Sequence, residues 1–97
     1  MTAGSQEEAS RMARTLVEEK LAACVNIIPG MKSIYRWKGK LEEGAETVVI
    51  AKTRESLAAQ LTERVKSLHS YECPCVVSIP IQSGNGAFLD WIGSETG

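Results

Sequence analysis

An α+β sandwich is the fold class that the sequence predicts, and the spacing of its apolar residues is the main reason. Apolar residues recur at helical spacing in some segments, while others are short and rich in β-branched residues. The helical segments are 6–21, 53–68 and 88–92, and the strand segments are 24–28, 33–37, 47–52 and 76–81. One strand before the first helix completes a ferredoxin-like βαββαβ sandwich with a short C-terminal helix. Only residues 1–3 are left for that strand ahead of the first helix, so we predict a truncated first strand.

Length and composition fit one small globular domain, residues 1–97. A chain of this size buries roughly 60–65% of its unfolded surface, so a lone monomer is expected to be marginally stable. Apolar residues make up 43% and charged residues 24%, which excludes a disordered or collagen-like chain. The net charge of −1 argues against a nucleic-acid partner, and no apolar run is long enough to span a membrane. With no secretory signal in the first eight residues, we expect a cytoplasmic protein.

The two longer helices have different start signals. Ser5 and Glu8 have the spacing of a capping box, in which each side chain satisfies a free backbone amide of the first turn. Thr53 is the expected N-cap of the second helix. The apolar stripe of that helix is formed by Leu57, Leu61, Val65 and Leu68.

A long β-hairpin is predicted between the two longer helices. Pro29-Gly30 interrupts its first arm, and Lys38-Gly39 lies where the chain reverses. A hairpin of this length leaves open strand edges that a second copy can pair with, and closed pairing predicts a homotrimer. Tyr35 and Trp37 share a parity on this hairpin, and we expect them to be interface anchors in preference to ligand-stacking residues. Pro80 predicts that the last strand lies at an edge, bulges or ends there.

Three cysteines, Cys24, Cys73 and Cys75, leave at least one thiol outside any intrachain disulfide. Cys73-Pro74-Cys75 is a C-x-C sequence, and thiols two residues apart on a strand are poorly placed to pair. We expect all three to be reduced, as in the cytosol. Small buried apolar residues are the alternative interpretation of all three.

The candidate metal ligands lie within seven residues: His69, Glu72, Cys73 and Cys75. Imidazole suits copper and zinc, and thiolates suit copper(I). Alternatively, His69 caps the second helix at its C-terminal end.

A second candidate site is a ligand-binding cleft formed by Cys24, Lys52, Tyr71 and Glu72. Lys52 shares its parity with Val48 and Ile50, so we expect it on the buried side, paired with a carboxylate such as Glu72, or extended toward water from the strand end. No Ser-His-Asp order, phosphate-binding glycine loop or H-E-x-x-H motif is present, so an enzyme is not expected.

Several blocks of the sequence, in the same order, resemble the CutA family of divalent-cation tolerance proteins. They are Ala22-Ala23-Cys24-Val25-Asn26-Ile27-Ile28-Pro29-Gly30, Ser33-Ile34-Tyr35-Arg36-Trp37-Lys38-Gly39-Lys40-Leu41-Glu42-Glu43, Lys52-Thr53, His69-Ser70-Tyr71-Glu72-Cys73-Pro74, Ile79-Pro80-Ile81-Gln82-Ser83-Gly84-Asn85 and Phe88-Leu89-Asp90-Trp91. The resemblance runs from about Thr2 to Ile92 and is far more specific than a single short motif.

The resemblance implies a ferredoxin-like subunit of a cytoplasmic homotrimer that is associated with tolerance of copper and other divalent cations, without an established reaction. It implies no required cofactor, with copper or another divalent cation weakly bound. Trimeric PII-type signalling proteins are similar, so a small-ligand or partner-binding module that uses a cleft between subunits is the alternative function. The His-Pro-Tyr-Glu of the family appears here with Ser70 in place of proline, which is expected to loosen this turn. The family usually has other residue types at Cys73 and Cys75, so their role is specific to this chain.

Overall fold

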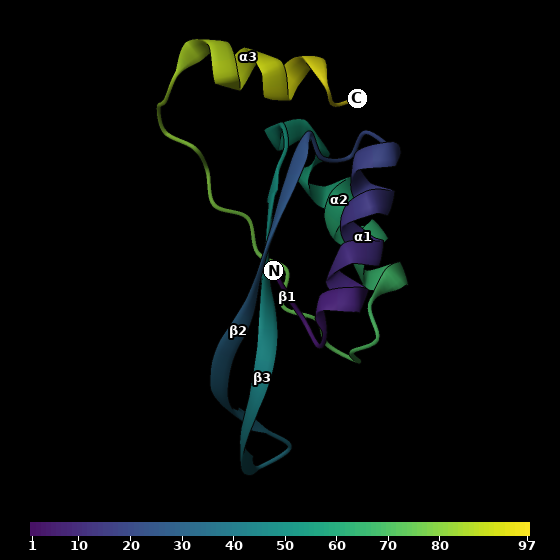
Figure 1. The fold of residues 1–97 in the computed structure, drawn as a ribbon, viewed down its shortest axis with the longest axis vertical. Coiled ribbons are helices and arrows are strands. Elements are labelled where there is room, and N and C mark those ends of the chain that lie inside the picture. The colour runs from purple at the N-terminus through teal and green to yellow at the C-terminus, as the bar shows by residue number, and fades with distance from the viewer.

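The computed structural model describes all residues, 1–97, as three helices and a three-stranded antiparallel sheet (Figure 1). The elements are β1 (Thr2–Ala3), α1 (Gln6–Glu18), β2 (Cys24–Trp37), β3 (Lys40–Lys52), the 3-10 turn η1 (Glu55–Leu57), α2 (Ala58–Leu68) and α3 (Gly86–Ser94). The strand order is β1-β3-β2. The predicted α+β class and long hairpin are confirmed, and the first strand has only two residues.

The hairpin β2–β3 dominates the shape of the molecule. Its register runs from Cys24 opposite Lys52 to Trp37 opposite Lys40, with one irregularity between Ile28 and Met31. Lys38 and Gly39 both have positive φ, 50° and 80°, as a two-residue type I′ turn requires. The predicted reversal at Lys38-Gly39 is therefore confirmed.

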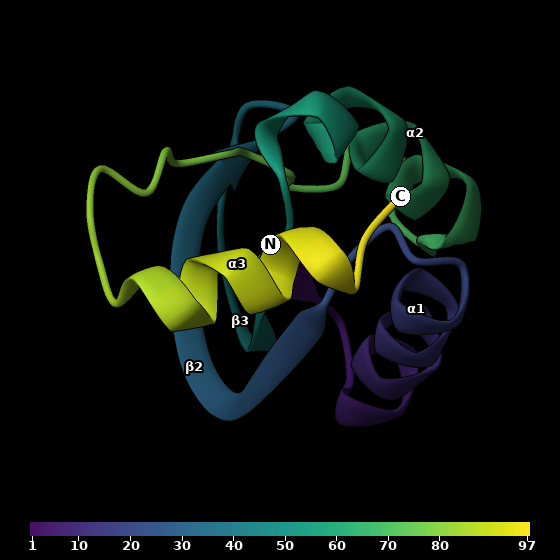
Figure 2. The same cartoon turned by 90° about the horizontal axis from the view of Figure 1, so that it is seen from above.

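The core lies between one face of the sheet and the helices α1 and α2, which Figure 2 shows together on one side of the hairpin. Its largest fully buried side chains are Met12, Leu16, Val49 and Val65. Only 15 of the 97 residues are buried, and the radius of gyration of 14.2 Å exceeds the roughly 12.5 Å of a compact chain of this length. A large part of the hairpin therefore projects beyond the core.

Two predictions for the second half of the chain are wrong. The segment Val76–Ile81 is not a strand, because no strand of the same chain lies beside it to complete a ladder of hydrogen bonds. Thr53 does not cap a helix: Arg54 precedes η1 without a side-chain cap, and the buried Thr53 Oγ1 has no hydrogen-bond partner. In contrast, the Ser5 cap is confirmed, since Ser5 Oγ accepts from the Glu8 amide at 3.1 Å.

α3 lies across the open end of the hairpin, away from the core (Figures 1 and 2). Its residue Ile92 is buried, whereas Phe88 and Trp91 stack on each other with ring centroids 5.6 Å apart and stay partly exposed. The guanidinium of Arg54 donates to Thr96 Oγ1 at 3.0 Å, to the Thr96 carbonyl at 2.6 Å and to the Gly93 carbonyl. Arg54 therefore fastens the C-terminal helix to the start of α2.

None of these helices combines the length and the apolar character that crossing a membrane requires.

We predict that Arg54→Ala releases α3. The variant loses three hydrogen bonds from one charged group, so hydrogen exchange of the α3 amides should accelerate and the free energy of unfolding should fall by about 1 kcal/mol. Arg14→Ala is the matched control, because Arg14 is exposed on α1 and makes no such bonds. Unchanged exchange in α3 would show that Ile92 alone holds the helix.

Candidate functional site

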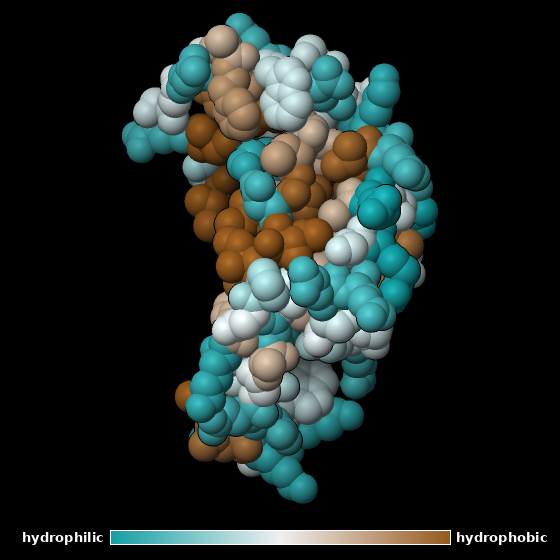
Figure 3. Space-filling view, in the orientation of Figure 1, coloured by the Kyte–Doolittle hydropathy of each residue, from teal (hydrophilic) through white to brown (hydrophobic).

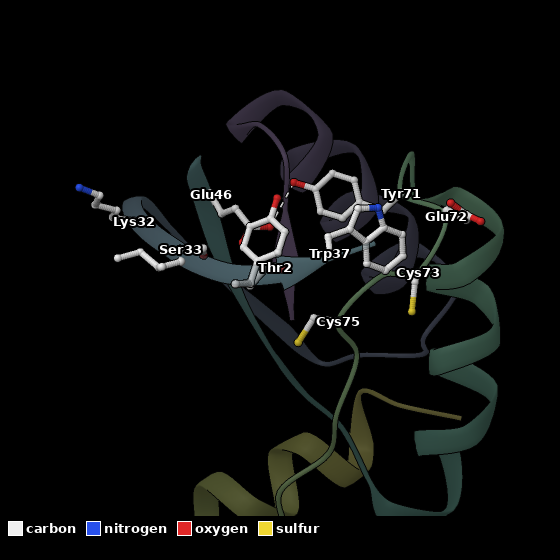
Figure 4. A pocket seen from close by; sticks show the side chains of 11 residues that line it. Thr2, Lys32, Ser33, Trp37, Glu46, Tyr71, Glu72, Cys73 and Cys75 are labelled. Carbon is white, nitrogen blue, oxygen red and sulfur yellow. Dashed lines mark hydrogen bonds between the residues drawn. The ribbon is translucent and has the colours of Figure 1, made fainter. Parts of the chain in front are cut away.

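An open hollow of about 730 Å³ lies where the hairpin meets the segment that follows α2 (Figure 4). Its lining residues are Thr2, Lys32, Ser33, Ile34, Tyr35, Trp37, Glu46, Tyr71, Glu72, Cys73 and Cys75. Three of the five aromatic residues of the chain are among them. Its volume falls within the range of small-molecule sites.

Tyr71 is held in this lining by a hydrogen bond on one side and by close packing against Gly4 on the other. Its hydroxyl donates to Glu46 Oε2 at 3.1 Å, a bond that Figure 4 marks with a dashed line. A Cβ added at Gly4 would lie 3.1 Å from the hydroxyl oxygen and 3.2 Å from the ring of Tyr71, so any larger residue at position 4 would press on the Tyr71 ring and shift it by a few tenths of an ångström. The pKa of Tyr71 is raised to about 12 by burial and then by the Glu46 carboxylate, so the phenol stays neutral at physiological pH.

His69 supports Tyr71 from behind. Its side chain is fully buried, and the two ring centroids are 4.6 Å apart. His69 Nδ1 accepts from the Tyr71 amide at 3.0 Å, and Nε2 donates to the Thr2 carbonyl at 2.8 Å. These partners assign a proton to Nε2 and leave Nδ1 as an acceptor, so both ring nitrogens are engaged. A metal ion at either nitrogen would break one of these bonds.

The buried carboxylate of Glu8 completes this arrangement. Its two oxygens accept from the Gly4 amide at 3.1 Å and from the Ser70 amide at 2.8 Å, and His69 Nδ1 lies 3.9 Å away. Burial alone would raise the pKa of Glu8, but the hydrogen bonds from Ser70 and Gly4, with the charge that His69 can carry, lower it below its usual range. Since a proline at position 70 has no amide hydrogen, the Ser70 bond is one that the family motif cannot make, and the expected loosening of this turn stays a prediction.

The predicted metal ligands are not assembled within one chain. Nowhere do three His, Cys, Asp or Glu side chains come close enough to hold a metal ion. Cys73, Cys75 and Glu72 line the hollow, but His69 does not, and Glu72 pairs with Lys38 at 3.5 Å. All three cysteines are free thiols. A metal site shared with another copy of the chain stays a prediction.

The predicted cleft divides into two places. Tyr71 and Glu72 line the hollow, whereas Cys24 and Lys52 face each other at the other end of the hairpin, where Lys52 Nζ contacts the Asn26 side-chain oxygen and lies 3.8 Å from Cys24 Sγ. The expected Lys52–Glu72 pair is therefore wrong. The expected burial of its side of the strand is also wrong, because Ile50 is 45% exposed and Val49 forms the core.

Tyr35 and Trp37 line the hollow and are 48% and 41% exposed in the single chain. Their interface role stays a prediction. The residue that sequence analysis missed is Glu46, which lies in an acidic stretch typical of a solvated loop. Its parity with Val48 was the available signal that it belongs to a face of β3 rather than to a loop.

We predict that Glu8→Gln lowers stability at pH 7 by about 1–2 kcal/mol and flattens its loss in acid. A lowered folded-state pKa means that ionised Glu8 stabilises the fold above its unfolded-state pKa of about 4.3, and that this stability disappears as pH falls through the folded-state value. Urea unfolding between pH 7 and pH 3 measures both effects. Glu7→Gln, an exposed neighbour in the same turn, should behave as wild type. Parallel curves for wild type and Glu8→Gln would contradict the assignment.

Comparison with known proteins agrees with this geometry. The model of the CutA1 divalent ion tolerance protein family matches residues 1–95. The divalent-cation tolerance protein CutA of Thermus thermophilus is 48% identical over 97 residues, which cover 100% of this chain and 94% of that protein. The chloroplastic protein CutA 1 of rice is 47% identical over 96 residues, 99% of this chain. The chain spans about half, 54%, of the length of that relative.

Solved structures give the same result. The Thermus thermophilus structure superposes with a TM-score of 0.96 at 49% identity and covers 99% of this chain and 93% of that chain. A structure from Archaeoglobus fulgidus, described as a periplasmic divalent cation tolerance protein, gives a TM-score of 0.94 at 50% identity, with 97% and 91% covered. The family has no known catalytic activity, in agreement with the expectation that the chain is not an enzyme. On its family match, its sequence identity and its superposition, the chain belongs to the CutA family of divalent-cation tolerance proteins.

Proposed function

We propose that this chain acts as a homotrimer in the tolerance of divalent cations, copper among them, by binding metal without turnover. The observation that carries the proposal is the family match over residues 1–95. The cytoplasm is the proposed compartment, because all three thiols are free. Relatives described as chloroplastic and periplasmic make this location a proposal and not a family property.

An exposed apolar surface supports the assembly. Val77, Ile79 and Ile81 stand at alternate positions and are 71%, 84% and 55% exposed. They lie in the segment between α2 and α3, in the part of the molecule where Figure 3 shows a continuous hydrophobic surface between α3 and the lower hairpin. The long strand β2 has an unpaired edge on the side away from β3. In the assembly we propose, residues 76–81 of one copy pair with such an edge of the next, which supplies the fourth strand of the predicted sandwich.

We predict that Ile79→Lys breaks this assembly. A buried, unpaired ammonium is costly, so light scattering should give about three times 10.5 kDa for wild type and a smaller mass for the variant. Gln60→Lys, which adds the same charge at an exposed site on α2, should stay trimeric. A wild-type monomer would overturn the proposed assembly.

Trp37→Ala separates the two roles considered for Trp37. If the variant loses the trimer in light scattering, Trp37 is an interface anchor; if the mass of the variant is unchanged, Trp37 lines the hollow only.

In this proposal the exposed thiols of Cys73 and Cys75, rather than the imidazole of His69, bind the metal. The thiols are accessible and line the same hollow, and thiolates are the ligands that copper(I) prefers. Glu72, water or a neighbouring copy would complete the coordination of a metal ion held by the two thiolates. His69 could bind a metal ion only after losing its hydrogen bond to the Thr2 carbonyl or to the Tyr71 amide.

We predict that the double variant Cys73→Ser/Cys75→Ser loses copper(I) affinity by at least about tenfold, because hydroxyls do not replace soft thiolate ligands. Competition with a chromogenic copper(I) chelator under reducing conditions measures the affinity. Cys24→Ser, at the distant end of the hairpin, is the control and should bind as wild type. Equal affinity in the double variant would remove these thiols from the site, and loss of affinity in His69→Ala alone would return the role to the imidazole.

A second candidate function, a small-ligand-binding module similar to PII proteins, is supported by the hollow itself. Its aromatic lining and one fixed carboxylate resemble a binding pocket more than a flat contact surface.

A further inference from the structure

We propose that the hollow binds a small organic ammonium cation, held by the carboxylate of Glu46 and by the ring faces of Tyr35, Trp37 and Tyr71. This inference rests on the second candidate function and names its ligand class. It does not depend on copper binding, and it requires that the rings of Tyr35 and Trp37 face the hollow in the assembled protein.

Among the charged residues that line the hollow, only Glu46 has no ion-pair partner. Lys32 in the lining pairs with Glu43 at 2.5 Å, and Glu72 in the lining pairs with Lys38 at 3.5 Å. Glu46 is partly buried and forms no ion pair. The Tyr71 hydroxyl occupies its Oε2, so Oε1 is available to a ligand. The hollow therefore has one unpaired charge, and it is negative.

The three aromatic side chains add a cation-attracting surface. Tyr35, Trp37 and Tyr71 are 48%, 41% and 38% exposed, although each is large enough to fill a core. The face of an aromatic ring attracts cations through its quadrupole, most strongly in tryptophan. One ammonium of the chain already uses this attraction, because Lys38 Nζ lies 5.7 Å from the centroid of Trp37. Figure 4 shows Trp37 beside Tyr71, with Glu46 reached by the Tyr71 hydroxyl.

An organic cation fits these groups better than a divalent metal ion does. Hard metal ions need six or more oxygen ligands, or several carboxylates, and the hollow offers one unpaired carboxylate. An alkylated ammonium is weakly hydrated and is recognised by aromatic faces with a single counter-charge. The volume of about 730 Å³ leaves room for a substituent on the nitrogen.

The test is a fluorescence titration of the full-length Trp91→Phe protein, in which Trp37 is the sole tryptophan. Tetramethylammonium chloride is the probe, tert-butanol is the neutral compound of similar size, and sodium chloride at equal concentration controls for ionic strength. We expect a saturable change with tetramethylammonium alone. Glu46→Gln should weaken binding about tenfold, and Tyr35→Leu should weaken it severalfold. Glu18→Gln, an exposed carboxylate on α1 that lies outside the hollow and forms no ion pair, should bind as wild type.

Three results would overturn the inference. They are the absence of a saturable change with tetramethylammonium, an equal response to tert-butanol, or an affinity for tetramethylammonium in both Glu46→Gln and Tyr35→Leu that equals that of the parent Trp91→Phe protein. Circular dichroism of each variant shows that it is folded. Light scattering and copper(I) competition on the same samples keep the two proposals apart. A trimer that binds copper(I) but not tetramethylammonium refutes the ammonium site alone, whereas saturable binding by a monomer supports that site and refutes the assembly.

Discussion

The carboxylate of Glu8 joins three parts of the chain that are far apart in sequence, and the geometry of the hollow depends on it. One oxygen holds the end of β1 through Gly4, the other holds the turn after α2 through Ser70, and the residue itself belongs to the first turn of α1. His69 packs into the same junction and positions Tyr71, because its Nδ1 accepts from the Tyr71 amide and the two rings are in contact. A buried carboxylate is stable only when such donors surround it. The position of Tyr71 and the packing of the first turn of α1 therefore depend on each other through Glu8.

Much of the fold could be predicted because local chemistry decides it. The Ser5–Glu8 cap, the reversal at Lys38-Gly39 and the apolar stripe of α2 each depend on residues within a few positions of one another. The last strand could not be predicted correctly for the single chain, since strand pairing depends on a partner and residues 76–81 have none in the same chain. Thr53 shows a further limit: its residue type suits a cap, but the helix begins later and leaves its hydroxyl unpaired.

The site was predictable only in part, for a related reason. The resemblance drew attention to His69 and Tyr71, but nothing local distinguishes a metal-binding imidazole from one whose two nitrogens are already bonded. The expected pair of Lys52 with Glu72 failed because strand parity gives the face of a residue and not its position along the strand. Lys52 lies at the Cys24 end of the hairpin, whereas Glu72 pairs with Lys38 near the turn. Glu46 belongs to the site because it accepts a hydrogen bond from Tyr71, which lies 25 residues away in the sequence. No short-range sequence pattern predicts a contact over that separation.

The irregularity in β2 at Pro29-Gly30 sets which side of the ribbon the aromatic residues occupy. Before it, paired positions of β2 and β3 sum to 76, as for Ile28 and Val48, and after it they sum to 77, as for Met31 and Glu46. The one extra residue, accommodated by Gly30 at a φ of 85°, thus exchanges odd for even along the rest of the strand. Tyr35 and Trp37 share a face with Glu46 only through this exchange, and an uninterrupted strand would turn both rings to the opposite face of the hairpin.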